Sequence, residues 1–218
     1  MNIHFTQQKN TEDNLYDQAI EIYIDSFPPN ERQCLDVIKH RINQGTSELY
    51  IGLLRDEVVS IGLLWDFKGS EFVLLDYMAV KKKYRNMGIG SLFVQFAKHI
   101  VHERNKTIFL ESEHPGFGEN KDERKKRILF YIRNGLLVLD KFIYMLPPLD
   151  NKTPTQMILM ISSGTSENML SHQSVHNLIL NLYNELYGRN AEDALLNSFI
   201  HLLPLKITLS KSIPYDIH

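Results

Sequence analysis

A run of basic residues and glycines, residues 81–91 (KKKYRNMGIGS), directly follows an apolar segment and can bind an anion. Gly88 and Gly90 lie where this loop enters a predicted helix. The first N–H groups of a helix have no partner within it, and the helix dipole adds partial positive charge there. Glycines let a phosphate approach the backbone, and Arg85 can add a charge-assisted contact. The segment predicts a site for a pyrophosphate or similar anion, with a flexible basic loop as the alternative.

Three carboxylates on predicted strands could accept a proton. Asp76 is the lone polar residue of a central apolar strand, and Glu111 and Glu113 point to one face of another. A carboxylate near the middle of a sheet is costly unless it is hydrogen-bonded or functional. The alternatives are that Asp76 lies at a turn or bulge and that the glutamates are solvated charges at a strand end.

The hydrophobic periodicity predicts the elements that position these residues. The expected helices span 12–26, about 30–45, 89–104 and 121–134, with Asn30 as a cap and Gly135 as a left-handed stop. The expected strands span 48–54, 57–67, 71–80, 107–113, 136–146 and 155–162, with Arg55-Asp56 as a hairpin turn. This order predicts an α/β fold with a mixed sheet.

The last quarter of the sequence differs from the rest. Residues 162–174 are polar and rich in turn formers, which predicts a linker. Apolar residues then recur at helical spacing over 175–187 and 191–203, ending at Leu202. We therefore divide the chain into a domain of residues 1–162 and a mainly helical appendage of residues 163–218. The appendage needs a surface to cover, either this chain's own sheet or that of a second copy in a homodimer.

Two motifs in order resemble the GNAT superfamily of acetyl-CoA-dependent N-acetyltransferases. One is Arg85-Asn86-Met87-Gly88-Ile89-Gly90 after the strand end Met78-Ala79-Val80, and the other is the later segment 130–136 (FYIRNGL). The resemblance covers about residues 1–162. Within the superfamily, the chain is similar to an uncharacterised bacterial branch. It implies a GNAT fold, with a mixed central sheet flanked by helices, and here a C-terminal helical extension.

The resemblance also implies roles for individual residues. The backbone of Met78, Ala79 and Val80 should bind the pantetheine arm, and the amides from Arg85 to Ser91 should hold the pyrophosphate of acetyl-CoA. Tyr131 should protonate the departing thiolate, with a core tyrosine as the alternative reading. Glu113, Glu111, Asp76 or a water chain should take the proton of the attacking amine. The chain departs from the family at Arg124 and Arg127, where Asn and a small residue are often found.

The expected reaction moves an acetyl group from acetyl-CoA to a primary amine of a small molecule or protein. A second hypothesis is a protein of another class, a non-catalytic acyl-CoA sensor or interaction protein. A third is a nucleic-acid-binding protein that uses the run of lysines at residues 81–83. The formal net charge of −2 favours neither nucleic acid nor membrane as a partner.

The single cysteine, Cys34, and the polar start of the chain fit a cytoplasmic protein without an export signal. His99 with His102, and His172 with His176, have helical spacing. Neither pair has a suitable third ligand nearby, so no metal is expected.

Overall fold

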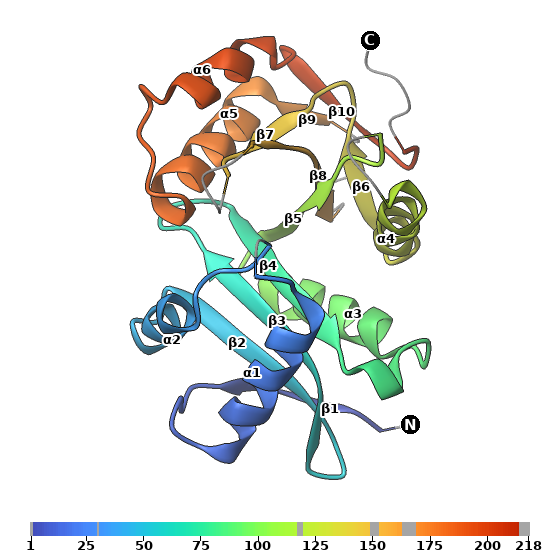
Figure 1. Ribbon diagram of the computed structural model, residues 1–218. Coiled ribbons are helices and arrows are strands. Elements are labelled where there is room, and N and C mark those ends of the chain that lie inside the picture. The colour runs from blue at the N-terminus through green and yellow to red at the C-terminus, as the bar shows by residue number, and fades with distance from the viewer. Residues whose placement is uncertain (1, 30, 117–119, 149–152, 163–168, 214–218) are drawn as a thin grey trace. The chain divides into compact units, whose positions relative to one another are not determined.

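The computed structural model describes residues 2–29, 31–116, 120–148, 153–162 and 169–213. Within these ranges the chain forms two compact units (Figure 1). The first unit contains residues 1–68 and 73–105, and the second contains residues 69–72 and 106–218. The predicted boundary between residues 162 and 163 borders a segment outside the described ranges and stays a prediction.

The sheet of the first unit is antiparallel, in the order β1-β2-β3-β4. Its strands are β1 (His4–Gln8), β2 (Ser47–Leu54), β3 (Glu57–Asp66) and β4 (Phe72–Val80). The predicted turn at Arg55 and Asp56 is confirmed, because both residues have positive φ, 50° and 65°, as a two-residue hairpin with the twist of its strands requires. Strand β1 was not predicted from the sequence, because most of its residues are polar.

Helices cover both faces of this sheet (Figure 1). They are α1 (Asn14–Ser26), α2 (Leu35–Asn43) and α3 (Ile89–His102). Ile61 and Leu63 of β3 share a buried cluster with α1 and α2. Gly62 lies between them and faces the other way, where an added Cβ would come within 1.9 Å of the Phe93 ring of α3. A glycine is therefore required for α3 to pack this closely.

The ends of these helices follow from their sequences. The carboxylate of Asp13 accepts a hydrogen bond from the N–H of Tyr16 and caps α1, which ends just before Phe27-Pro28, as predicted. Helix α2 begins at Leu35, later than expected, and the predicted cap Asn30 lies outside the described residues.

Every strand pairing within the second unit is antiparallel among the described residues. Its strands are β5 (Thr107–Glu113), β8 (Thr155–Ser162), β6 (Leu136–Leu139), β10 (Lys206–Ser210) and β9 (Met169–Ser171) in spatial order, with β7 (Tyr144–Leu146) also on β8. The expected single strand over 136–146 is two strands, separated by a turn in which Lys141 has φ 59°. Strands β9 and β10 were not predicted.

The helices of the second unit include the predicted C-terminal pair. They are α4 (Lys121–Arg133), α5 (His172–Asn181), the π-helical turn η2 (Leu182–Leu186), α6 (Ala194–Phe199) and the 3₁₀ turn η3 (Ile200–Leu202). Gly135, with φ 85°, ends α4 as predicted. The apolar side chains of α5, η2 and α6 are buried: Val175, Leu178, Ile179, Leu182, Tyr183, Leu186, Leu196 and Phe199.

Two expectations for the C-terminal segment were wrong. Leu202 is 64% exposed and Leu203 is buried instead, because the chain changes to a 3₁₀ turn after Phe199 and the helical spacing no longer holds. The predicted linker 162–174 includes β9 and the start of α5, and its residues 163–168 lie outside the described ranges. No helix within the described parts of the chain is long and apolar enough to cross a membrane.

Candidate active site

The loop between β4 and α3 presents an open helix N-terminus. A 3₁₀ turn, η1 (Lys82–Tyr84), leads to Asn86 with φ 63° and to Gly88 with φ 81°, the residue before α3. Gly88 caps the helix without a side chain, and no atom lies within 4 Å of the position that its Cβ would occupy. The first intrahelical bond of α3 runs from the N–H of Leu92 to the carbonyl of Gly88, so Ile89, Gly90 and Ser91 contribute the amides of the open first turn.

The basic residues of this loop divide between two tasks. The ammonium groups of Lys81 and Lys83 lie 2.8 and 2.9 Å from the carboxylate of Glu57, and the Tyr84 hydroxyl donates to it at 2.7 Å. These three donors lower the pKa of Glu57 to about 2. Arg85 is exposed, and its Nε donates to the carbonyl of Val80 at 3.1 Å. Lys81 and Lys83 therefore anchor the loop to β3, while Arg85 lies at the end of β4.

The predicted pantetheine-binding segment is the last part of β4. Met78, Ala79 and Val80 pair with Gly62, Ile61 and Ser60 of β3. Ala79 is buried in the cluster with α1 and α2, and Met78 and Val80 are half-buried. The segment thus runs in regular antiparallel pairing directly into the loop.

Asp76 lies at a β-bulge. Tyr77 pairs with Leu63 and Leu75 pairs with Leu64, so Asp76 is the extra residue in β4. Bulges re-aim side chains and are frequent next to active sites. Burial raises the pKa of Asp76 to about 7, although the positive charge of Arg41 opposes this rise. A carboxylate with this pKa can take up and release a proton near neutral pH.

Two tyrosines next to this bulge hold the chain between α1 and α2. The N–H of Gln33 donates to the hydroxyl of Tyr23 at 3.0 Å and to that of Tyr77 at 3.2 Å. Their rings pack edge to face with centroids 4.9 Å apart. The segment that follows Phe27-Pro28 is therefore anchored to the same strand that carries Asp76.

The two glutamates of β5 are both engaged. Glu113 accepts from Nε and Nη2 of Arg124 at 3.1 and 3.0 Å, and Nη1 of Arg127 lies 3.5 Å away. The two arginines that depart from the family pattern thus form an ion-pair cluster. Glu111 accepts a 2.7 Å hydrogen bond from the hydroxyl of Tyr187, which follows the π-helical turn η2.

Tyr131 lies in the last turns of α4 and is 9% exposed. Burial raises its pKa to about 12, and the nearby positive charge of Arg127 opposes this only in part. The hydroxyl is therefore protonated at neutral pH and is available as a donor. Its ring packs edge to face on Phe130, with centroids 5.1 Å apart, so it also fills space in the unit.

Sequence reasoning missed two residues that act on the candidate carboxylates, Arg41 and Tyr187. Each comes from an element far along the chain from its carboxylate, and neither belongs to a motif. Nothing in the local sequence distinguishes them from an ordinary helical arginine and a core tyrosine.

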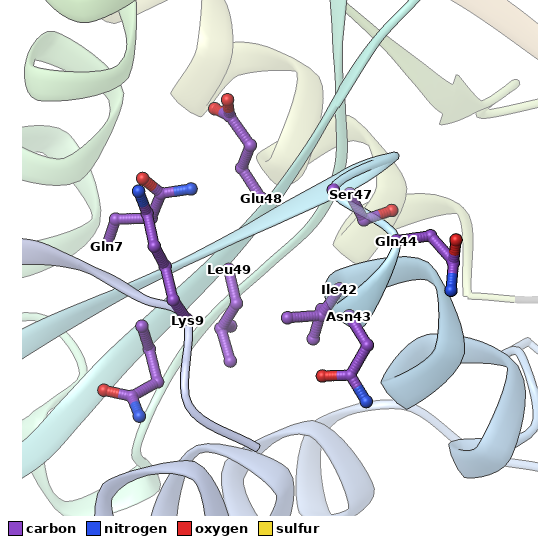
Figure 2. A pocket seen from close by; sticks show the side chains of 10 residues that line it. Gln7, Lys9, Ile42, Asn43, Gln44, Ser47, Glu48 and Leu49 are labelled. Atoms are coloured by element: carbon purple, nitrogen blue, oxygen red, sulfur yellow. The ribbon is translucent and has the colours of Figure 1, made fainter.

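A pocket of about 470 Å³ lies elsewhere on the first unit (Figure 2). Gln8 pairs with Leu49 at this end of the sheet, whereas the loop after β4 follows Val80, which pairs with Ser60 at the other end. The pocket is lined by Gln7, Gln8, Lys9, Ile42, Asn43, Gln44, Gly45, Ser47, Glu48 and Leu49. None of the predicted site residues lines it. In the described ranges, no three His, Cys, Asp or Glu side chains come together as metal ligands would.

Comparisons with known proteins show what this chain is similar to. The model of the acetyltransferase (GNAT) family matches residues 16–118, which include the β4–α3 loop. A protein of Bacteroides thetaiotaomicron assigned as a GNAT-family acetyltransferase superimposes with a TM-score of 0.70 at 24% identity, over 85% of this chain and 98% of that one. None of the curated proteins compared with the sequence matches it.

Two further solved structures contain the coenzyme. A GNAT-family acetyltransferase of Elizabethkingia anophelis with bound acetyl-CoA has a TM-score of 0.52 at 15% identity, over 74% of this chain and 97% of that one. An aminoglycoside 6'-N-acetyltransferase complexed with coenzyme A has a TM-score of 0.55 at 18% identity, over 73% of this chain and 96% of that one. The chain has the GNAT fold, and the predicted fold class, a mixed sheet flanked by helices, is confirmed.

Proposed function

We propose that the protein is an N-acetyltransferase that moves an acetyl group from acetyl-CoA to a primary amine. The observation that supports this most directly is the open N-terminus of α3 after β4. Gly88 leaves the first amides of the helix uncovered, and the exposed Arg85 in the same loop donates to the carbonyl of Val80 at the end of β4. In this proposal the amides from Arg85 to Ser91 hold the pyrophosphate, and the backbone of Met78 to Val80 binds the pantetheine arm.

The proton acceptor in this proposal is Asp76. An amine with an ordinary pKa near ~10.4 is protonated at pH 7 and must lose a proton before it can attack. Asp76, with a pKa of about 7, can accept and release a proton near neutral pH. Glu113 suits this role less well, because its carboxylate is bound by the guanidinium groups of Arg124 and Arg127. Glu111, bonded to Tyr187, is the second candidate.

The reaction then balances without a covalent enzyme intermediate. The ammonium group gives its proton to the carboxylate of Asp76, and the neutral nitrogen attacks the carbonyl carbon of the thioester. The new C–N bond forms as the C–S bond breaks, and the nitrogen, now positively charged, loses its second proton to water to give the neutral amide. The thiolate takes a proton from Tyr131, which regains one from solvent, and Asp76 releases its proton to water. Binding both substrates supplies proximity.

Turnover in the presence of amines tests this proposal. The purified protein is first analysed by mass spectrometry for a copurified CoA species. Thiol release from acetyl-CoA is then followed with an aminoglycoside, a polyamine and a lysine-containing peptide. Release that depends on one of the amines is expected. Tight acetyl-CoA binding without release would favour the alternative of an acyl-CoA sensor, and absence of both would overturn the proposal. The cytoplasmic location and the possible homodimer stay predictions.

A further inference from the structure

A single carboxylate, that of Glu57, binds three side chains of the loop between β4 and α3. Its oxygens lie 2.8 Å from the ammonium nitrogen of Lys81 and 2.9 Å from that of Lys83, and they accept a 2.7 Å hydrogen bond from Tyr84. The ammonium nitrogen of Lys83 also lies over the ring of Tyr84, 4.8 Å from its centroid. Three of the first four residues of the loop are therefore bound to one residue of β3.

The register of β3 and β4 brings Glu57 to this loop. Val80, the last residue of β4, pairs with Ser60. The N–H of Lys81 then donates to the carbonyl of Val59 at 2.8 Å. The chain thus leaves the sheet alongside the first residues of β3, where Glu57 lies. Because β3 is paired with β2 on one side and β4 on the other, Glu57 is a fixed point to which the loop can be bound.

The rest of the loop has a backbone conformation that benefits from fixed ends. Asn86 has φ 63° and Gly88 has φ 81°, values in the left-handed region, which residues other than glycine seldom adopt. Ile89, the first residue of α3, is buried and fixes the far end of the loop, while Glu57 fixes the near end. A ligand that binds a mobile backbone must order it, which lowers the affinity, and a loop held in place beforehand avoids this loss.

The negative charge of Glu57 has the opposite effect on an anion. A carboxylate repels a pyrophosphate, so Coulomb's law alone predicts that the coenzyme binds more tightly when Glu57 is neutral and its two lysines are released. An exposed ion pair by itself contributes little, but here one carboxylate joins three donors of the same loop. The positional and the electrostatic effects of Glu57 on binding therefore have opposite signs, and a measured affinity distinguishes them.

We propose that Glu57 is a positioning residue for the coenzyme, which holds the loop after β4 in the conformation that binds the pyrophosphate of acetyl-CoA. This rests on the proposed function, in which the loop and the start of α3 bind the coenzyme. Lys81, Lys83 and Tyr84 are the groups through which Glu57 acts. Glu57 itself does not contact the coenzyme.

The experiment compares Glu57→Gln, which keeps the size of the side chain and removes its charge, with Glu48→Gln as the matched control. Glu48 lies in the same unit and binds Arg104 at 2.8 Å, and its side chain is 22% exposed, against 30% for Glu57. Calorimetry with acetyl-CoA should give a dissociation constant about tenfold higher in Glu57→Gln, because ordering even one backbone residue on binding costs this much. The constant should be unchanged in Glu48→Gln.

Tyr84→Phe is a second variant, which removes one of the three donors and leaves the charge of the carboxylate in place. It should raise the dissociation constant in the same direction but by less. In steady-state kinetics with the best amine of the panel, the KM for acetyl-CoA should rise with the dissociation constant, while kcat and the KM for the amine change little. A general loss of folded protein would instead lower the apparent kcat.

Hydrogen exchange of the loop amides gives a readout that does not need the coenzyme. Exchange in residues 81–91, followed by mass spectrometry, should be faster in Glu57→Gln than in the wild type, and acetyl-CoA should slow it again. Unchanged exchange overturns the proposal, and so does acetyl-CoA binding that is unchanged or tighter in Glu57→Gln. A wild-type protein that does not bind acetyl-CoA contradicts the proposed function and with it this role, whereas the exchange then still reports whether Glu57 holds the loop.

Discussion

At the scale of single residues, Asp76 combines a role in the proposed chemistry with a cost to folding. Its pKa of about 7 lies above the value of ~3.9 for an unperturbed aspartate, because burial disfavours the charged form. Between these two pH values the unfolded state has released its proton and the folded state has not. The free energy of unfolding therefore falls as the pH rises from about 4 to about 7.

Replacing Asp76 by Asn should remove this penalty. We expect Asp76→Asn to raise the free energy of unfolding by ~1–3 kcal/mol at pH 8 and by much less at pH 4, where the folded wild type is protonated and the unfolded state is about half protonated. Urea unfolding at the two pH values measures the difference. A gain of the same size at both would show that the carboxylate is not the cause. The same variant should lose most of its turnover.

The second prediction at this scale concerns Tyr131. If its hydroxyl protonates the thiolate, Tyr131→Phe should lower kcat by ~10²-fold or more with little change in acetyl-CoA binding. Tyr183→Phe is the matched control. Its hydroxyl donates to the carbonyl of Met145 at 2.6 Å in the same unit, so this change should reduce stability and leave kcat unaltered. Steady-state kinetics and calorimetry separate the two effects. Wild-type turnover in Tyr131→Phe, with chemistry rate-limiting, would remove the acid role.

What the sequence reveals about single residues depends on whether their partners are local. The open start of α3 after the loop could be predicted because the first amides of any helix lack partners within the helix. The bulge at Asp76 could be predicted as an alternative because a carboxylate in an apolar strand requires a reason. Arg41 and Tyr187 could not be predicted, since each acts across the fold on a carboxylate distant in sequence.

At the scale of elements, the proposed anion site depends on the backbone geometry of the loop after β4 and of the start of α3. Gly88→Val should weaken acetyl-CoA binding strongly, because a β-branched side chain at φ 81° both strains the loop and covers the amides. Gly45→Val is the matched control, with φ 69° and no atom within 4 Å of the added Cβ, in the same unit. Both variants should lose similar stability, so calorimetry with acetyl-CoA isolates the effect on binding. Equal affinity in the two folded variants would contradict the anion site.

The elements that could be predicted from the sequence are those in which apolar residues recur with a clear helical or strand periodicity. Strands β2 to β5 and helices α1, α3 and α4 have long apolar patterns and lie close to their expected bounds. Strands β1 and β10 have five residues each and few apolar positions, so only their partners in the sheet define them. Strand β10 buries Ile207 and Leu209 and pairs with β6, contacts that no local pattern specifies.

At the scale of the whole molecule, the C-terminal segment is an integral part of the second unit. Its buried side chains pack around Tyr144, whose ring centroid lies 5.8 Å from that of Phe199 and 6.1 Å from that of Tyr183. Similarity over 85% of 218 residues, or about 185, exceeds the 162 residues of the predicted first domain, so the shared fold extends into this segment. The apolar side chains of α5, η2 and α6 are buried within the second unit.

Deleting residues 165–218 should expose this apolar surface and cause aggregation, because each buried Leu, Ile or Phe contributes ~1.5–3 kcal/mol. A gentler pair of variants tests the same point. Ile207→Ser, at a fully buried position of β10, should destabilise the protein strongly, whereas Leu205→Ser, at a position 85% exposed, should not. Light scattering and thermal unfolding measure both. A truncated protein that stays soluble, keeps its mass and acetylates as well as the full chain would contradict this account.

The most direct measurement of the central claim is the fate of the acetyl group itself. Acetyl-CoA labelled with ¹³C in the acetyl carbons is incubated with the full-length protein and each amine of the panel, and the products are analysed by mass spectrometry and NMR. The account predicts that one amine acquires the labelled acetyl group on nitrogen, at a rate that falls in Asp76→Asn and Tyr131→Phe. Label that stays on CoA, or appears only as free acetate at the same rate with and without amine, would contradict it.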